Sequence, residues 1–119
     1  MTELAERIAA VPYYAYLGLR ADPNGAIVMP ADDRHASDRP QVHGGVLTAL
    51  LEAAGSLHLG VDARPSDVTA TFLRPAELVD THARARTVRR SRRFAHLEIV
   101  AWQADPDAPV AVAHGTWIL

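Results

Sequence analysis

The sequence contains no cysteine and no lysine among its 119 residues. Without cysteine the chain cannot form a disulfide, a thiolate nucleophile or a zinc–thiolate site, and without lysine it cannot form a Schiff base with a carbonyl substrate. Aromatic residues make up 6% of the chain and the formal net charge is −2, so neither stacking platforms nor a basic balance favours nucleic acid. No apolar run approaches the roughly 18 residues of a membrane span. We therefore expect neither a nucleic-acid nor a membrane partner.

The chain is long enough for one hydrophobic core, at 49% hydrophobic residues, and too short for two ordinary domains. We expect a single domain spanning residues 1–119. The first ten residues place Glu3, Glu6 and Arg7 in a helical pattern, unlike the basic-then-apolar order of a secretory signal. This pattern favours a soluble cytoplasmic protein. The histidines show no metal-ligand spacing, so no metal site is predicted.

The order of local patterns predicts a mixed α and β fold. The expected elements are a helix over 3–10, a lead into a strand over 14–20, a turn at 22–25, a strand over 26–30, a polar loop over 31–41, a helix over 44–59, and strands over 67–74, 79–90, 93–103 and 110–119. Long strands joined by short connections favour an antiparallel meander. The long helix is apolar on most of its circumference, which predicts one curved sheet around one central helix.

Glu52 lies in the middle of this apolar helix, beside Leu50 and Leu51. Burying a polar group without a partner costs roughly 2–7 kcal/mol, and a charged group costs more. Residues three or four apart share a helix face, so Thr48 and Ser56 form a polar stripe with Glu52. A carboxylate that costs stability here points to a function. A structural ion pair with an arginine across an interface is the alternative.

The helix is preceded by His43 and begins with Gly44 and Gly45. The first N–H groups of a helix have no intrahelical acceptor and carry the positive end of its dipole. Glycine adds no side chain that would keep a ligand from these donors. The segment predicts donors for a developing oxyanion, with Glu52 as base or nucleophile and an imidazole at the mouth of the site. The alternative for the two glycines is a tight turn.

Four features in this order resemble PaaI-like hotdog-fold acyl-CoA thioesterases over nearly the whole chain. They are Val42-His43-Gly44-Gly45 at the helix start, the acidic Glu52 nine residues after the histidine, Phe72-Leu73-Arg74-Pro75-Ala76 at a strand end, and Arg89-Arg90-Ser91-Arg92-Arg93 at a tight strand connection. Each feature is weak alone and specific in combination. The resemblance implies an α+β hotdog fold, in which one long central helix is wrapped by a curved antiparallel sheet.

The resemblance also implies roles for the residues at the helix. In that family the backbone N–H after the histidine polarises the thioester carbonyl, which corresponds to Gly44 here. The acidic helix residue, supplied by the partner subunit, acts as nucleophile or as base for water, which corresponds to Glu52. His43 would orient the carbonyl or the turn. The expected assembly is a homodimer or a dimer of dimers (a homotetramer), and no cofactor is expected because coenzyme A is part of the substrate.

The chain departs from the family at one position. The family often has Asn or Gln about six residues before the histidine, whereas this chain has Ser37 there, with Asp38 beside it. Ser37 and Asp38 are therefore candidate substrate-binding residues, together with Gly45, Thr48 and Ser56 on the helix. For Ser56, a hydrogen bond to the backbone carbonyl four residues earlier is an equal alternative.

The arginines near two strand ends are candidate contacts to the phosphates of CoA, since the guanidinium fork matches phosphate geometry. The first group comprises Arg89, Arg90, Arg92 and Arg93, for which a solvated hairpin end is the alternative. Arg74 is a further candidate, or an ordinary surface residue at a strand end.

The predicted reaction is hydrolysis of an aryl- or medium-chain acyl-CoA thioester to a carboxylic acid and free CoA. Ala49, Ala53 and Ala54 on the helix leave room for such an acyl group. Two alternatives remain open. A hotdog enoyl-CoA hydratase or dehydratase uses a similar histidine and carboxylate but has a more proline-rich helix entry. A non-catalytic acyl-CoA binding module is compatible with the missing Asn or Gln.

Overall fold

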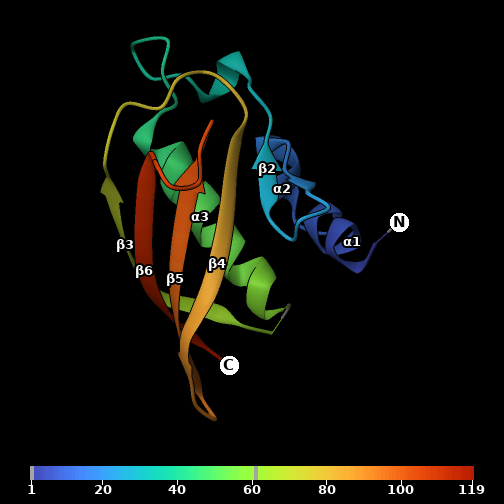
Figure 1. Ribbon diagram of the computed structural model, residues 1–119. Helices are drawn as coiled ribbons and strands as arrows, with labels where there is room; N and C mark the ends of the chain where they lie inside the picture. Colours follow the sequence, from blue (N-terminus) through green and yellow to red (C-terminus); the bar gives the residue numbers. More distant parts are fainter. Residues whose placement is uncertain (1, 61) are drawn as a thin grey trace.

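The computed structural model describes residues 2–60 and 62–119 of the chain. One sheet is covered on one face by a long helix. Two short helices lie beside the edge of the sheet that is formed by its first two strands (Figure 1). In chain order the elements are α1 (Glu3–Ala9), α2 (Pro12–Leu17), β1 (Arg20–Ala21), β2 (Ile27–Met29), the 3₁₀ helix η1 (Asp33–His35), α3 (Gly44–Leu59), β3 (Arg64–Phe72), β4 (Thr81–Arg90), β5 (Phe94–Trp102) and β6 (Ala111–Ile118).

The sheet has six strands in the order β1-β2-β4-β5-β6-β3, and every pair is antiparallel. Strands β4, β5 and β6 follow one another in sequence and in space, which confirms the predicted meander. Strand β3 pairs only with β6 within the described chain and forms one edge of the sheet, with a bulge between Pro65 and Asp67. The predicted α+β hotdog fold, a long helix wrapped by a curved antiparallel sheet, is confirmed.

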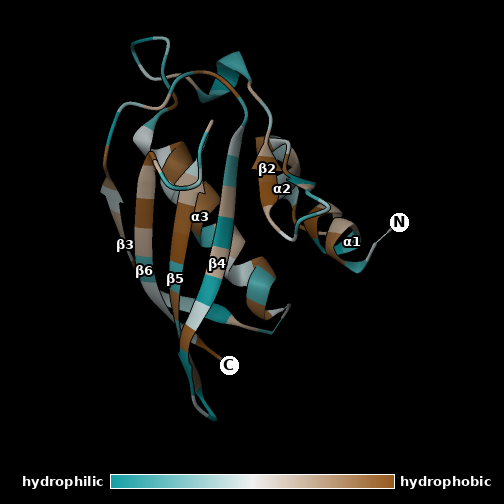
Figure 2. Ribbon diagram, in the orientation of Figure 1, coloured by the Kyte–Doolittle hydropathy of each residue, from teal (hydrophilic) through white to brown (hydrophobic). Residues whose placement is uncertain are grey.

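The core lies between α3 and the facing sides of the strands (Figure 2). Side chains alternate between the two faces of a strand, and in β6 the inward positions are Ala111, Ala113, Gly115 and Trp117, all buried. Small residues at the first three positions let the helix approach the sheet closely. The helix contributes seven buried residues to this core, as its apolar circumference predicted.

The segment before the first strand differs from the prediction. Residues 14–17 belong to helix α2, and the expected strand follows it as the short β1, which begins at Arg20. Pro12 occupies the first turn of α2, where its fixed φ suits a helix and its missing N–H costs nothing. Gly18 ends the helix with a φ of 76°, a left-handed conformation that glycine adopts readily. The proline therefore ends the region of α1 and also begins a second helix.

Smaller differences concern boundaries. The strand predicted over 67–74 is β3 and begins at Arg64, because its bulge lets the chain continue pairing past Pro65. The polar loop over 31–41 contains the single turn η1, whose first N–H groups are capped by the Asp32 side chain. Among the described residues no helix is both long and apolar enough to cross a membrane.

Candidate functional site

The start of α3 is capped by His43. Its Nδ1 accepts a hydrogen bond of 2.8 Å from the Gly45 N–H, and its carbonyl accepts from Leu47 N at 3.0 Å. A ring nitrogen that accepts has no proton, so the neutral imidazole has its proton on Nε2. His43 is exposed, and no hydrogen bond within residues 2–60 and 62–119 involves this Nε2–H. The predicted imidazole at the mouth of the helix is thus also a structural cap.

The cap involves only one of the two glycines. The Gly45 N–H is occupied by His43 and is no longer available to a ligand. Within residues 2–60 and 62–119, no group accepts a hydrogen bond from the Gly44 N–H, which lies at the positive end of the helix dipole. A Cβ on Gly44 would lie 3.3 Å from the ring of Phe72, a residue with 52% of its surface exposed. Gly44 therefore offers a backbone donor beside an exposed aromatic ring.

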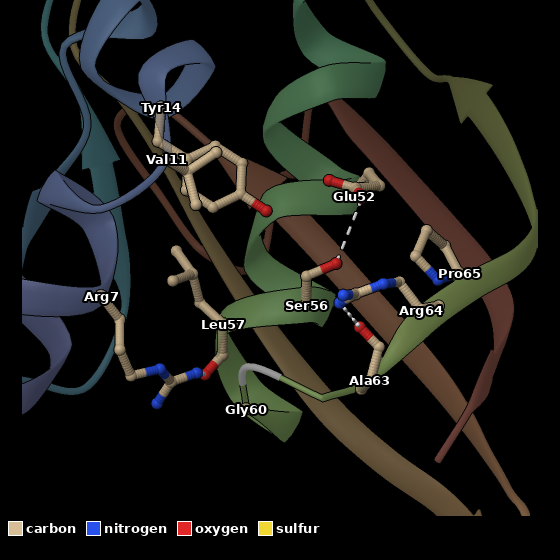
Figure 3. Close-up of a pocket in the computed structure, with 10 residues that line it drawn as sticks. All are labelled: Arg7, Val11, Tyr14, Glu52, Ser56, Leu57, Gly60, Ala63, Arg64 and Pro65. Carbon is tan, nitrogen blue, oxygen red and sulfur yellow. Dashed lines mark hydrogen bonds between the residues drawn. The ribbon is translucent and has the colours of Figure 1, made fainter.

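Glu52 lies at the midpoint of α3, at the wall of a cavity of about 180 Å³ (Figure 3). The cavity lies between α1, α2, α3 and the start of β3 and opens to the surface. Its lining residues are Arg7, Val11, Tyr14, Glu52, Ser56, Leu57, Gly60, Ala63, Arg64 and Pro65. The residues Ala49, Ala53 and Ala54 do not line it, and Ala53 is fully buried in the core. Ala54 instead lines a second hollow, on the other side of Leu57, so room for an acyl group beside these alanines stays a prediction.

The carboxylate of Glu52 is half-buried and has partners. Burial raises the pKa of Glu52, while hydrogen bonds from Ser56 and Tyr14 oppose that rise. The Ser56 hydroxyl lies 3.2 Å from Glu52 Oε1. The prediction of a carboxylate without compensation is corrected, because two hydroxyl groups face it. An ion pair across an interface would involve a second subunit and stays an open alternative.

The polar stripe on α3 is confirmed, with different partners for its members. Thr48 donates to the Gly44 carbonyl at 2.9 Å, which is the i−4 backbone bond suggested for Ser56. Ser56 instead donates to Glu52 and accepts from Trp117 Nε1 at 3.0 Å. Binding of a substrate by Thr48 or Ser56 stays a prediction.

Gly44 and Glu52 are not brought together within one chain. They are eight residues apart on the same helix, which at 1.5 Å per residue separates them by about 12 Å. A single thioester carbonyl cannot contact both groups across that distance. The predicted pairing of the two therefore requires a second copy of the chain.

Ser37 and Asp38, which stand where the family often has Asn or Gln, lie in the loop before α3. The Ser37 hydroxyl is engaged within this loop, donating to the Arg39 carbonyl at 3.3 Å and accepting from the Arg39 N–H at 3.2 Å. The loop closes through a hydrogen bond from Ser37 N to Gln41 O, so Asp38 lies at its exposed tip. Ser37 and Asp38 flank the helix start from this loop, and a role for them in substrate binding stays a prediction.

The candidate arginines occupy opposite ends of α3. Arg74 follows β3 by two residues, on the side where Phe72 reaches Gly44. The other four lie at the hairpin between β4 and β5, all exposed: Arg89, Arg90, Arg92 and Arg93. Arg90 lines a surface hollow together with Gly60 at the far end of α3. One chain thus has basic groups near each end of the helix, and phosphate binding by them stays a prediction.

Most residues that line the cavity were not predicted from the sequence, and Tyr14 and Arg7 are two polar ones among them. Tyr14 is buried and its hydroxyl points toward Glu52 and Ser56 (Figure 3). Arg7 lies across the cavity and donates from Nη2 to the carbonyl of Leu57 near the end of α3. The signal that could have identified Tyr14 is Pro12, since a helix that begins at proline places Tyr14 and Leu17 on one apolar face.

Comparison with known proteins identifies the family. A family model described as the acyl-CoA thioesterase N-terminal domain matches residues 32–118. The chain belongs to this family. The predicted family, hotdog fold and class of enzyme, a thioester hydrolase, are thereby confirmed. No curated protein matches the sequence at a significant level.

Several solved structures are similar to this thioesterase. PaaI of Thermus thermophilus, a phenylacetic acid degradation protein, shares 26% identity at a TM-score of 0.79, covering 91% of this chain and 98% of its own. A thioesterase of Pseudomonas aeruginosa shares 25% identity at a TM-score of 0.84, covering 99% and 94%. A Bacillus halodurans protein with bound CoA shares the fold, at 20% identity and a TM-score of 0.77, covering 97% and 81%.

Among residues 2–60 and 62–119, no three histidine or acidic side chains come together in a way that could hold a metal ion. The groups that the thioesterase offers at the site are therefore one backbone donor, one carboxylate, the hydroxyls around that carboxylate, and arginines at both ends of α3.

Proposed function

We propose that this thioesterase hydrolyses an acyl-CoA thioester to a carboxylic acid and free CoA, with Glu52 as nucleophile or general base and the Gly44 N–H as oxyanion donor. The observation that supports this proposal best is the half-buried carboxylate beside a cavity of about 180 Å³. A charged group at such a position costs stability, and a cavity next to it gives a substrate access.

The chemistry needs only these two groups. Glu52 either removes a proton from water, which then attacks the thioester carbonyl, or attacks the carbonyl itself to form an anhydride that water hydrolyses. The carbonyl oxygen becomes negative as the tetrahedral intermediate forms, and the Gly44 N–H stabilises that charge. The intermediate collapses by breaking the carbon–sulfur bond, and the CoA thiolate takes up a proton. Because a thiolate is a good leaving group, a strong second acid is unnecessary, and we propose no cofactor.

We propose that the site is completed by a second copy of the chain. The support is the separation of about 12 Å between Gly44 and Glu52 in one chain. Strand β3 provides a route to assembly, since its outer edge is unpaired within the described chain and most of its residues are exposed (Figure 1). A long open strand edge favours pairing with another strand.

Two copies joined antiparallel along β3 would have their α3 helices side by side in opposite directions. The Gly44 end of one helix would then approach the middle of the other, where Glu52 lies. The exposed Phe72 and Ile118, near opposite ends of β3 and its neighbour β6, would gain cover at such an interface. A dimer, or a dimer of dimers, follows from this arrangement.

The cavity also bears on the acyl group. A cavity of about 150 Å³ is known to hold one benzene molecule, so the space beside Glu52 is sufficient for one aromatic ring or a short chain. Its apolar lining comes from Val11, Leu57, Ala63 and Pro65. An aryl or short to medium acyl group therefore fits the proposal, with the phosphates of CoA bound by the exposed arginines.

The test is release of free thiol from a panel of aryl- and alkyl-CoA thioesters, measured alongside equilibrium binding of the same esters. The proposal predicts turnover with a preference for acyl groups that fit one ring-sized cavity. Tight binding of the esters without turnover would instead identify a binding module. Addition of water across an enoyl-CoA double bond, with the thioester intact, would identify a hydratase.

A further inference from the structure

The indole of Trp117 is linked to Glu52 through one hydroxyl group. Trp117 lies on β6, is fully buried, and donates from Nε1 to Ser56 Oγ at 3.0 Å. Ser56 Oγ in turn lies 3.2 Å from Glu52 Oε1. We call these three residues the donor chain. It connects the core of the protein to the carboxylate at the cavity wall.

In the structure the donor chain runs from Trp117 through Ser56 to Glu52, and the indole fixes the direction of its first step. An indole nitrogen has a proton and no free lone pair, so it can donate but never accept. Ser56 must therefore accept from Trp117, and the single hydroxyl proton of Ser56 is left to point at Glu52 Oε1. A donor aimed at a carboxyl oxygen stabilises the ionised form over the neutral acid. The direction of the donor chain favours the form of Glu52 that a base or a nucleophile requires.

Two glycines make the position of the indole possible. A Cβ on Gly55 would lie 2.5 Å from the Trp117 ring, and a Cβ on Gly115 would lie 2.6 Å from it. Real Cβ atoms do not approach other atoms this closely, so any side chain at either position would displace the ring. The fully buried ring packs against both glycines, Gly55 on α3 and Gly115 on β6. The indole N–H is therefore held in one orientation toward Ser56.

A second donor reaches Glu52 from a different element. The hydroxyl of Tyr14 on α2 points into the space between Glu52 and Ser56 (Figure 3). Burial and the nearby Glu52 charge raise the pKa of Tyr14, so the phenol keeps its proton and can donate it to a hydrogen bond. The charged groups that face the same cavity are Arg7 from α1 and Arg64 from β3. Hydroxyl donors thus approach the carboxylate from two sides, while the cavity is open to a substrate.

We propose that Trp117 and Tyr14 are positioning residues for Glu52: Trp117 acts through Ser56 and Tyr14 acts directly, and together they keep the carboxylate ionised and oriented toward the cavity. The proposal rests on the proposed role of Glu52 in thioester hydrolysis. Neither residue is proposed to transfer a proton or to bind the thioester. They lower the pH at which Glu52 becomes protonated, and with it the acid limb of the pH–activity profile. They also orient the carboxylate.

The experiment is a double-mutant cycle on the full chain. The variants are Ser56→Ala, Trp117→Phe, the double variant, and Tyr14→Phe. Trp102→Phe is the matched control, because Trp102 is the other buried tryptophan and lies outside the donor chain. Two readouts are measured for each variant: the pH profile of kcat/KM, and the titration of the Glu52 carboxyl carbon by ¹³C NMR. The Glu52 signal is assigned as the one missing from Glu52→Gln.

Loss of a donor should move the titration of Glu52 to higher pH in Ser56→Ala, Trp117→Phe and Tyr14→Phe. On the acid side of the profile kcat/KM should fall roughly tenfold in Ser56→Ala and Tyr14→Phe, the equivalent of one hydrogen bond to a charged group. The fall should be smaller in Trp117→Phe, which leaves the Ser56 hydroxyl in place. Trp117→Phe should add nothing to the titration shift in the Ser56→Ala background, since Trp117 acts through Ser56. The Trp102→Phe control should titrate as the unmodified chain does.

The proposal is overturned if Glu52 titrates unchanged in folded Trp117→Phe, or if the effects of Trp117→Phe and Ser56→Ala simply add. Should Trp117→Phe fail to fold, Tyr14→Phe and Ser56→Ala decide the question, because they remove only hydroxyl groups. The NMR titration does not need turnover. A chain with the predicted titrations but no thioesterase activity would contradict the proposed function while supporting the donor chain.

Discussion

Helix α3 presents two different groups at two points along its length, and they are built in different ways. At the first turn the group is the Gly44 N–H, partly exposed, which needs only a glycine and a cap from His43. At the midpoint it is the Glu52 carboxylate, whose surroundings come from α1, α2, β3 and β6 as well. The donor is specified by neighbours in sequence, whereas the carboxylate is specified by the tertiary structure.

The Gly44 N–H and the Glu52 carboxylate also differ in what they can contribute to a reaction. A backbone N–H is fixed by the helix and needs no particular ionisation state, so it suits the developing oxyanion. A carboxylate can move a proton or attack, but only if its environment keeps it ionised while burial opposes ionisation. About 12 Å separates the two groups in one chain, and for this reason we propose that two chains share each site.

The largest expected effect on activity comes from replacing Glu52. Glu52→Gln keeps the volume and the acceptor facing Ser56, but it removes the charge that attacks or deprotonates water. We expect kcat to fall 10²–10⁴-fold with little change in KM, as is typical for loss of a general base. Steady-state kinetics on the best CoA ester measures this. Near-normal turnover would remove Glu52 from the mechanism.

The same variant has a stability signature with a defined sign. Burial raises the pKa of Glu52 in the folded chain, so ionisation costs stability. The cost is absent below the pKa of the unfolded chain and is fully present above the raised folded pKa. Glu52→Gln should therefore melt slightly higher than the original chain at neutral pH, and the difference should disappear on acidification. A clear loss of stability at neutral pH would indicate a structural ion pair instead.

The second prediction tests the Gly44 N–H as oxyanion donor. Gly44→Pro removes the N–H, and proline is well suited to the first position of a helix. The preceding His43 already has φ −60° and ψ 138°, which a following proline requires. We expect kcat to fall roughly 10²–10³-fold, as for loss of one oxyanion donor. Gly44→Ala is the matched control, because its Cβ meets the same Phe72 ring but the N–H remains. Equal losses in both variants would show that Phe72 contact is responsible.

The sequence could predict the features that depend on neighbours in the chain better than those that depend on the tertiary structure. The helix start, its free donor and the unusual position of Glu52 are local patterns, and all three are present in the structure. The β periodicity of the last three strands was also sufficient for the meander. Local rules succeed where the determining residues are close together in the chain.

The surroundings of Glu52 could not be predicted in this way. Ser56 and Trp117 are sixty-one residues apart, and no local pattern links an indole to a particular hydroxyl. Tyr14 was missed because residues 14–20 were expected to lead into a strand, whereas Pro12 begins a helix that contains Tyr14. The proposed pairing of Gly44 with Glu52 involves a second chain, and the sequence of one chain says little about how two chains associate.

The third prediction concerns the arginines of the β4–β5 hairpin, which are Arg89, Arg90, Arg92 and Arg93. If they bind the CoA phosphates, replacing them with alanine should raise KM for CoA esters by about tenfold or more. KM for a short pantetheine ester, which lacks the nucleotide, should change little. Arg20→Ala, at the opposite side of the sheet, is the control. Equal changes for both esters would remove the phosphate role.

The smallest effect is expected at the cap. His43→Ala leaves the Gly45 N–H without an acceptor and should cost about 1 kcal/mol of unfolding free energy, measured by denaturant titration. His43→Asn should restore most of that stability, since asparagine is a good N-cap residue. If its activity also returns, His43 acts by shaping the turn. If stability returns and activity does not, the imidazole itself contributes to the reaction.

The central claim is that each site combines Gly44 of one chain with Glu52 of another, and mixing two inactive variants tests it most directly. Gly44→Pro and Glu52→Gln chains are unfolded together, refolded as a mixture, and assayed for thiol release. In a mixed dimer one of the two sites contains both intact groups, so random pairing should restore roughly a quarter of the original activity. Each variant refolded alone should stay inactive. If mixed dimers form and no activity returns, the shared site does not exist.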